Sequence, residues 1–181
     1  MSDINRNLFE FFFGLTGRNG LLDSFGIFLA NTLPYLMVLG FLVFAIGHKN
    51  WKLRWLILAE GAMATILSRG IITEAIRFFY HNPRPFVALS LSPLITESSY
   101  SFPSGHAVFF FALAMTIFYH NRRLGWWYFA LSLINGLARI FVGVHWPLDI
   151  AGGIVLGIFS GFIVHQLIKP YLRQITTTSQ I

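Results

Sequence analysis

The chain contains 181 residues, of which 55% are hydrophobic and only 11% are charged, and its mean hydropathy is +0.64. This composition indicates an integral membrane protein. The net charge of +6 does not favour nucleic-acid binding, because the basic residues stand in twos and threes at the ends of apolar segments, where membrane topology accounts for them. The absence of cysteine excludes disulfides, cysteine-ligated zinc and a thiol nucleophile.

No linker, long charge run or fixed-period repeat divides the sequence, so we expect residues 1–181 to form a single integral membrane domain. Several apolar stretches are long enough to cross a hydrocarbon core of about 30 Å, which requires about 20 helical residues. They cover residues 21–47, 53–80, 104–120, 126–142 and 148–168. The lack of short alternating segments favours helices over a β-barrel. We therefore predict an all-α, polytopic membrane bundle of five to six transmembrane helices.

Residues 4–15, before the first long stretch, are apolar but short. This length favours a helix that lies in the membrane interface or is half inserted, with a sixth span as the open alternative. The segment lacks the pattern of a cleavable signal, because Asp3 and Glu10 accompany a single Arg6 and no basic start precedes a long apolar core.

The order of the spans assigns each loop to one side of the membrane. With five spans, the N-terminus, the loop 81–103 and the turn around His145 share one side. The opposite side carries most of the basic residues outside the motifs described below, namely Lys49, Lys52, Arg54, Arg122, Arg123, Lys169 and Arg173. The positive-inside rule makes that opposite side cytoplasmic. We therefore expect a multi-pass protein of the cell membrane in which His145 faces the periplasm or the cell exterior.

The second span contains three ionisable residues, Glu60, Arg69 and Glu74. Ionisable groups inside a membrane are usually paired or functional. Glu74 stands three residues before Arg77, a helical spacing that would let the carboxylate orient the arginine. Glu60 and Arg69 could equally be packing partners, and none of the three is predicted to be catalytic. His48, His120 and His165 are predicted to be bystanders.

Three arginines, Arg77, Arg84 and Arg139, stand near the ends of predicted spans. A guanidinium group binds phosphate oxygens through a planar fork and stays charged in a poorly solvated pocket. Three such groups could neutralise a phosphoryl group during its transfer, as a metal ion does in other enzymes. A single arginine at such a place could equally reach towards lipid head groups, so the combination carries the interpretation.

His145 is the candidate nucleophile, whose ring would attack phosphorus to form a phosphohistidine that water later hydrolyses. Asp149 follows four residues later, and on a shared helical face its carboxylate would fix the ring tautomer and stabilise the imidazolium. The pair could instead be a structural hydrogen bond or two metal ligands. Because the nearby arginines would repel a cation, we expect no metal and no other cofactor.

The tetrapeptide Pro103, Ser104, Gly105 and His106 is typical of a helix start, with proline in the first turn and glycine allowing a ligand to approach the backbone. The free amides of a helix start favour an anion. Ser104 could donate its hydroxyl to that anion, and His106 could be the general acid that protonates the leaving oxygen. Alone, the tetrapeptide is an ordinary helix-start signal.

The predicted topology brings the three groups of residues together. Arg77 ends the second span, Ser104 begins the third, and the turn with His145 joins the fourth span to the fifth. All three therefore reach the same membrane interface.

These segments resemble the signature of the type 2 phosphatidic acid phosphatase superfamily, which reads Lys-x6-Arg-Pro, Pro-Ser-Gly-His and Ser-Arg-x5-His-x3-Asp. The resemblance covers residues 77–149 and is specific in its joint spacing. It implies a helical membrane core and metal-independent hydrolysis of phosphate esters or diphosphates. By the same resemblance, the catalytic residues are His145, His106 and Asp149, and the phosphate-binding residues are Arg77, Arg84, Ser104, Gly105 and Arg139.

Two positions depart from that signature. Arg77 replaces lysine, which keeps the positive charge but changes reach and geometry. Ala138 replaces serine, and the loss of one neutral hydrogen bond would weaken the site by about 0.5 to 1.5 kcal/mol. We therefore leave Ala138 out of the predicted site.

The membrane setting favours a lipid phosphate that enters from the bilayer. The compact chain and the sequence around Asn82 to Phe86 resemble bacterial undecaprenyl diphosphate phosphatases. Hydrolysis of phosphatidylglycerophosphate or phosphatidic acid would use the same residues and is the first alternative. A non-catalytic lipid-phosphate binding or flipping protein is the second, although binding alone would not require both histidines and Asp149. Haloperoxidase chemistry is disfavoured by the hydropathy, and the oligomeric state is not predicted.

Overall fold

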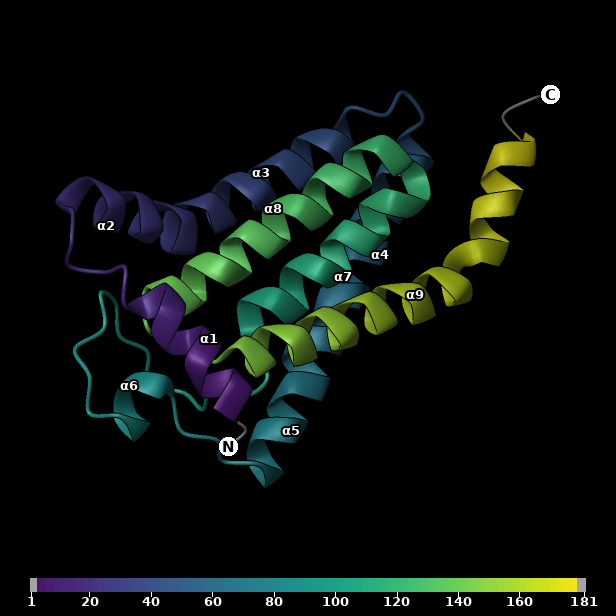
Figure 1. The fold of residues 1–181 in the computed structure, drawn as a ribbon. Helices are drawn as coiled ribbons and strands as arrows, with labels where there is room; N and C mark the ends of the chain where they lie inside the picture. The colour runs from purple at the N-terminus through teal and green to yellow at the C-terminus, as the bar shows by residue number, and fades with distance from the viewer. Residues whose placement is uncertain (1–2, 179–181) are drawn as a thin grey trace.

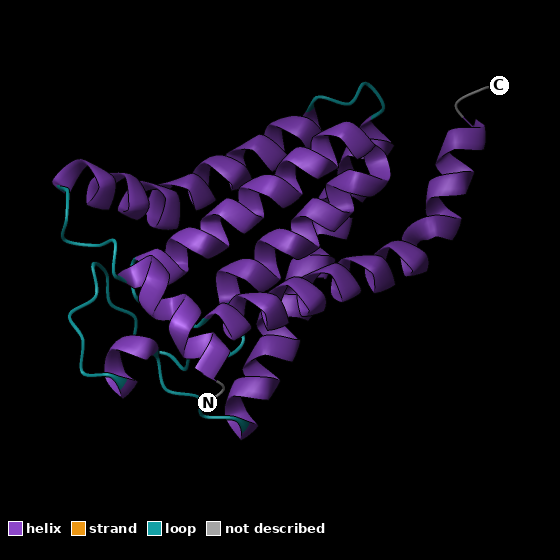
Figure 2. Ribbon diagram, viewed as in Figure 1, coloured by secondary structure: helices purple, strands orange, loops and turns teal. Residues whose placement is uncertain are grey.

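The computed structural model describes residues 3–178, and within that range all regular secondary structure is helical (Figure 2). The prediction of an all-α membrane protein is confirmed. The helices are α1 (Asp3–Phe13), α2 (Gly20–Ile27), η1 (Phe28–Thr32), α3 (Leu33–Ile46), α4 (Trp51–Thr65), η2 (Ile66–Ile72), α5 (Thr73–Phe79), α6 (Pro85–Ala88), α7 (Gly105–His120), α8 (Arg122–Phe141) and α9 (Pro147–Thr178).

Several of these elements join into long rods. The π-helical segment η1 links α2 to α3, and η2 links α4 to α5, so that each set forms one continuous helix. Three helical segments are long and apolar enough to cross a membrane, Gly20–Ile46, Trp51–Phe79 and Pro147–Leu172, and α7 is apolar but shorter. Together with α8, they coincide with the five predicted spans, while the number of crossings stays a prediction.

Helix α1 occupies the predicted short apolar segment. At 11 residues it is about 16 Å long, which favours the interfacial or half-inserted alternative, and a sixth span stays untested. It packs against α8 and α9 at the end of the bundle where α7 begins (Figure 1). Phe9 is fully buried and its ring lies 5.0 Å from that of Trp146, while the Asn5 side chain accepts a hydrogen bond from the backbone N–H of Leu148. Helix α1 therefore holds the turn that precedes α9.

Helix α7 is the central element and packs against α4, α8 and α9. Glycines let α9 approach it closely, because a Cβ atom added to Gly157 would lie 2.6 Å from the carbonyl oxygen of Val108. A Cβ on Gly153 would likewise lie 2.6 Å from Cβ of Ala107. Small residues at such contacts are the usual means of helix association in membranes. This packing fixes the start of α9 beside the start of α7.

Large apolar side chains cover the outside of the bundle. In the most apolar 18-residue stretch of Gly20–Ile46, only 28% is buried within the protein. The buried share of the corresponding stretch of Trp51–Phe79 is 39%. Leu39, Trp55 and Val155, for example, are all more than half exposed. Such continuous apolar surface is stable in contact with lipid chains and not with water. The chain is therefore a multi-pass membrane protein.

The loops divide between the two ends of the bundle (Figure 1). The α3–α4 and α7–α8 turns lie at one end, together with Lys49, Lys52, Arg122 and Arg123. Helices α1 and α6 and the start of α7 lie at the other end. This arrangement agrees with the predicted grouping of the loops.

A buried polar cluster lies far from the predicted site and links three helices. Glu60 of α4 is fully buried, and its two carboxylate oxygens lie 2.7 Å from Nε2 of His120 and 2.8 Å from Nδ1 of His165. The ring of Tyr119 stacks on that of His165. Both histidines lie outside the site described next, and their lack of a catalytic role stays a prediction. Their contacts join α4, α7 and α9.

Candidate active site

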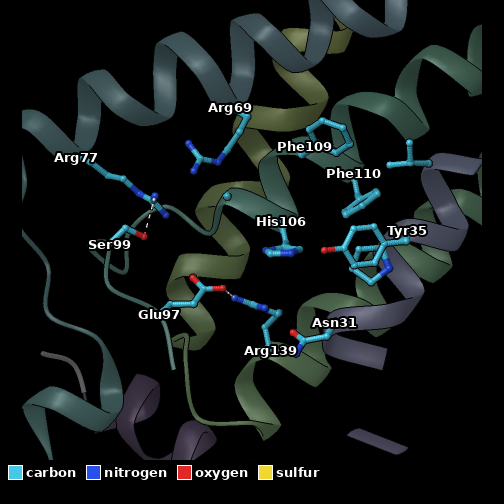
Figure 3. A pocket seen from close by; sticks show the side chains of 13 residues that line it. Asn31, Tyr35, Arg69, Arg77, Glu97, Ser99, His106, Phe109, Phe110 and Arg139 are labelled. Carbon is cyan, nitrogen blue, oxygen red and sulfur yellow. Dashed lines mark hydrogen bonds and ion pairs between the residues drawn. The ribbon is translucent and has the colours of Figure 1, made fainter. Parts of the chain in front are cut away.

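Four of the predicted site residues, Arg77, Gly105, His106 and Arg139, line a cavity at the end of the bundle that holds α1 and α6 (Figure 1). The other four are buried and do not line it, namely Arg84, Ser104, His145 and Asp149. The cavity has a volume of about 590 Å³. Its wall combines charged side chains with apolar ones from α3 and α7 (Figure 3). The lining residues are Asn31, Pro34, Tyr35, Val38, Arg69, Arg77, Glu97, Ser99, Gly105, His106, Phe109, Phe110 and Arg139.

Arg84 is held by the loop that precedes α7 and by the α8–α9 turn. Its Nε donates to the carbonyl oxygen of Ser99 at 2.7 Å, and its Nη1 donates to that of Val144 at 2.9 Å. Nη1 also lies 3.4 Å from Nε2 of His145. Burial lowers the pKa of Arg84 to about 10, so the group stays charged at neutral pH. Arg84 therefore places a positive charge directly beside the predicted nucleophile.

Glu97 bridges two of the predicted phosphate-binding arginines. One carboxylate oxygen lies 2.5 Å from Nη2 of Arg84, and the other pairs with Nη2 of Arg139 (Figure 3). Both arginines are almost fully buried, whereas Glu97 is 28% exposed. A carboxylate that engages two guanidinium groups occupies the kind of position that phosphate oxygens would take.

Arg77 reaches the same cavity from the end of α5. Its Nη2 donates to the carbonyl oxygen of Pro103 at 2.9 Å, and its Nη1 lies 3.8 Å from Glu74. This contact agrees with the predicted orienting role of Glu74. The Nε groups of Arg77 and Arg139 have no hydrogen-bond partner within residues 3–178, which leaves these donors available for an anion.

His145 and Asp149 lie side by side, as the spacing predicted. Nδ1 of His145 is 3.4 Å from Oδ2 of Asp149, and both side chains are about 1% exposed. Helix α9 begins at Pro147, so His145 lies just before the helix and not on its first turn. The contact arises because the carboxylate of Asp149 reaches back over the turn and accepts the backbone N–H of Trp146 at 2.8 Å.

The surroundings of His145 keep its ring neutral. Burial, followed by the positive charges of Arg139 and Arg84, lowers the pKa of His145 well below its ordinary value of 6.5. The neutral ring has a free lone pair on one nitrogen, which nucleophilic attack requires. With Asp149 beside Nδ1, that lone pair belongs to Nε2, on the side of Arg84.

The predicted helix start at residues 103–106 is confirmed, with one correction. Helix α7 begins at Gly105 and Ser104 is its N-cap, so Pro103 precedes the helix and does not lie in its first turn. The Ser104 hydroxyl accepts the N–H of Ala107 and is fully buried. Its predicted phosphate contact stays a prediction. Gly105 and His106 both line the cavity.

Polar residues outside the motifs complete the site. Ser101 donates its hydroxyl to Oδ2 of Asp149, and Asn82 lies within hydrogen-bond distance of Oδ1 at 3.4 Å. Ser99 contacts both Arg77 and Arg84. The contacts of Asn82, Ser99 and Ser101 were not predicted from the sequence. Ser99 and Ser101 had no recognisable signal beyond lying directly before the helix start.

Ala138, at the position where the signature has serine, is not among the residues that line the cavity. It packs in an apolar cluster with Ala30, Phe141, Val142 and Val144. A methyl group suits this environment better than a hydroxyl group, which would need a partner. The structure thus gives a packing reason for this departure from the signature.

A membrane bundle with buried guanidinium groups around a neutral histidine and its aspartate defines a membrane-embedded phosphatase. The cavity presents donors for an anion, since guanidinium groups bind phosphate and repel metal cations. Residues 58–173 match the model of the PAP2 superfamily. The chain therefore belongs to the PAP2 superfamily, and it is a metal-independent hydrolase of phosphate esters or diphosphates.

Individual relatives agree with this assignment. The chain is 31% identical over 175 residues to the undecaprenyl-diphosphatase BcrC of Bacillus subtilis, covering 93% of this chain and 88% of that protein. The crystal structure of Aquifex aeolicus LpxE superimposes with a TM-score of 0.73 at 25% identity, over 91% of this chain and 96% of that chain. A PAP2-type phosphatidylglycerolphosphate phosphatase from Bacillus subtilis shares the fold, with a TM-score of 0.67 at 20% identity over 92% and 85%.

The position of Glu97 leads to a prediction about substrate affinity. Its carboxylate pairs with Arg84 and Arg139, so on the prediction that these arginines bind phosphate, the substrate has to displace it and the apparent affinity is reduced. We expect Glu97→Gln to lower KM for a phosphate substrate by about 3- to 10-fold and to tighten inhibition by orthovanadate. Steady-state kinetics of the purified protein in detergent measure both quantities.

Glu97→Asp is the matched control, because it keeps the charge on a shorter side chain. It should show a smaller change than Glu97→Gln. A higher KM in Glu97→Gln would mean instead that the carboxylate holds the loop in its working position.

Proposed function

We propose that this protein hydrolyses undecaprenyl diphosphate, or a closely similar polyprenyl diphosphate, to the lipid monophosphate and inorganic phosphate. The observation that supports this most directly is the position of His145, with Nδ1 beside Asp149 and Nε2 beside Arg84. This is the arrangement that an attacking imidazole needs at the edge of a phosphate-binding site. The polyprenyl diphosphate specificity is supported by the similarity to the undecaprenyl-diphosphatase BcrC of Bacillus subtilis.

The proposed reaction has two steps. Nε2 of His145 attacks the terminal phosphorus while Arg77, Arg84 and Arg139 neutralise its oxygens, and the lipid monophosphate leaves. Water then attacks the phosphohistidine and releases inorganic phosphate. Asp149 fixes the tautomer of the nucleophile and stabilises its positive charge, in the manner of a catalytic triad.

Three residues at the start of α7 have the remaining proposed roles. His106 lines the cavity and is the general acid that protonates the leaving oxygen. The backbone at Gly105, in the first turn of the helix, lies where an anion is favoured by the helix dipole. Ser104 caps this helix and adds a hydroxyl near the phosphate.

The shape of the cavity supports a substrate with a lipid tail. Tyr35 and Val38 of α3 line it together with Phe109 and Phe110 of α7. These residues belong to apolar helices, so the charged end of the cavity continues into an apolar wall at membrane depth. A polyprenyl chain could follow this wall into the bilayer while its diphosphate faces the arginines.

We propose that the cavity opens towards the periplasm or the cell exterior. The basic residues gathered at the opposite end of the bundle support this orientation through the positive-inside rule. Because the chain has no cysteine, single cysteines can report on sidedness. In intact cells, a membrane-impermeant maleimide should label Ser98→Cys and not Lys49→Cys. The reverse labelling pattern would contradict the proposed orientation.

Phosphatidylglycerophosphate is the competing substrate, since the fold is shared with a phosphatase of that lipid. A substrate panel in detergent separates the two, by measuring phosphate released from undecaprenyl diphosphate, phosphatidylglycerophosphate and phosphatidic acid with a chelator present. We expect the highest kcat/KM for undecaprenyl diphosphate. A clear preference for phosphatidylglycerophosphate would replace the proposed substrate, and equal phosphate release by wild type and His145→Ala would favour a binding protein.

A further inference from the structure

A further guanidinium group reaches the cavity from a part of the chain outside the signature motifs. Arg69 belongs to η2, the π-helical segment of the Trp51–Phe79 span, and lines the cavity with Arg77 and His106 (Figure 3). π-helical turns interrupt the regular hydrogen bonding of a helix and are frequent at functional sites. The irregular turn thus coincides with the point where an arginine enters the cavity.

Contacts fix Arg69 beside the start of α7. A Cβ atom added to Gly105 would lie 2.5 Å from Nε and 3.1 Å from Cδ of Arg69, so the arginine side chain lies directly over the glycine. On its other side Arg69 pairs with Glu74, and the same carboxylate oxygen lies 3.8 Å from Nη1 of Arg77. Glu74 therefore holds two guanidinium groups close together next to the phosphate-binding helix start.

The charges of this group do not cancel. One carboxylate, Glu74, is shared between Arg69 and Arg77, which leaves one net positive charge. An ionisable group inside a membrane span is unfavourable unless it is paired or has a function. The Arg69 side chain is 39% exposed and faces the cavity, so an anion from the substrate can reach it. The transferring phosphoryl group already has three arginines, so a second anionic group is the better match for Arg69.

We propose that Arg69 binds the phosphate that stays attached to the lipid, and that it makes the enzyme prefer diphosphate over monophosphate substrates. This inference rests on the proposed function. When Nε2 of His145 bonds to the terminal phosphorus, the bond from that phosphorus to the bridging oxygen breaks, and its electron pair passes to the oxygen. Negative charge therefore develops on the leaving lipid monophosphate in the transition state, where Arg69 stabilises it as His106 transfers its proton to the leaving oxygen. A monophosphate substrate lacks this second phosphate.

The test uses two substrates with the same tail, farnesyl diphosphate and farnesyl monophosphate, and the purified full chain in detergent. For Arg69→Gln we expect kcat/KM for the diphosphate to fall by ~10- to 100-fold, the usual loss for a charged hydrogen bond. The value for the monophosphate should change by less than about threefold, as expected where no such bond is made. Arg69→Lys keeps the charge and should restore part of the diphosphate activity.

Several outcomes would overturn the inference. Equal losses of kcat/KM on both substrates in Arg69→Gln, or no loss on either, contradict the inference. The proposed function stays intact in these cases as long as wild type hydrolyses the diphosphate. Wild type that releases no phosphate from farnesyl diphosphate contradicts both. If Arg69→Gln does not fold, Arg69→Lys supplies the comparison through inhibition constants. The inference expects weaker inhibition by inorganic diphosphate and unchanged inhibition by orthophosphate, and equal changes for the two inhibitors overturn it.

Discussion

Replacing His145 with asparagine should reduce phosphate release by at least ~10⁴-fold, because the proposed covalent intermediate forms on its ring nitrogen. The imidazole is 1% exposed and contacts Asp149 and Arg84 on its two nitrogens. Asparagine keeps a polar group there but has no nucleophilic nitrogen. The measurement is phosphate release from undecaprenyl diphosphate in detergent, together with acid- and base-quench trapping of a radiolabelled terminal phosphate on the protein.

A phosphohistidine is labile in acid and stable in base, so wild type should retain label only after the base quench. His145→Asn should retain none. His48→Asn is the matched control, because His48 lies at the opposite end of the bundle, where its Nδ1 contacts the carbonyl oxygen of Phe44. Substantial turnover by His145→Asn, with the control unchanged, would mean that another residue is the nucleophile.

Arg139→Gln should lower kcat/KM by ~10³- to 10⁵-fold, the range seen when an arginine that neutralises a transferring phosphoryl group is removed. Arg139 is 1% exposed, and its Nε has no hydrogen-bond partner within the described part of the chain. Its guanidinium group pairs with Glu97, and in the proposed mechanism its charge neutralises the transferring phosphoryl group. Steady-state kinetics and the melting temperature in detergent separate a catalytic loss from unfolding.

Arg139→Lys tests whether charge alone is sufficient. Lysine keeps the positive charge but loses the planar fork, so we expect an activity between those of wild type and Arg139→Gln. Arg122→Gln is a control for charge in a helix at the opposite end, where Arg122 lies 5.8 Å from the centre of the Phe118 ring. A change of less than tenfold in Arg139→Gln would remove Arg139 from the proposed phosphate site.

The sequence was sufficient to predict the helical bundle and the meeting of the three motifs. Apolar length sets each span, and alternating crossings decide which loops share an end. The spacing of His145 and Asp149 also predicted their contact, although the helix begins after His145. The prediction succeeded because the short turn keeps residues four apart in reach even before the first helical residue.

Contacts made by the loop before α7 could not be predicted in this way. Glu97 pairs with Arg139, and Ser101 donates to Asp149, across separations that follow no helical or strand period. The π-helical segments likewise have no known composition signal, so the entry of Arg69 into the cavity was not foreseen. The Glu60 cluster was not predicted either. Its two histidines lie on other helices, at separations from Glu60 that follow no helical or strand period.

The carboxylate of Glu97 has a consequence for discrimination between free and membrane-anchored anions. Because Glu97 pairs with Arg84 and Arg139, it weakens the electrostatic attraction of the cavity for every small anion in the surrounding water. A lipid whose tail is already held in the bilayer meets the cavity at a much higher effective concentration than a dissolved ion does. The competing carboxylate lowers the apparent affinity for both ligands by the same factor. Only the lipid has the effective concentration to offset this loss, so we expect released phosphate to inhibit turnover weakly.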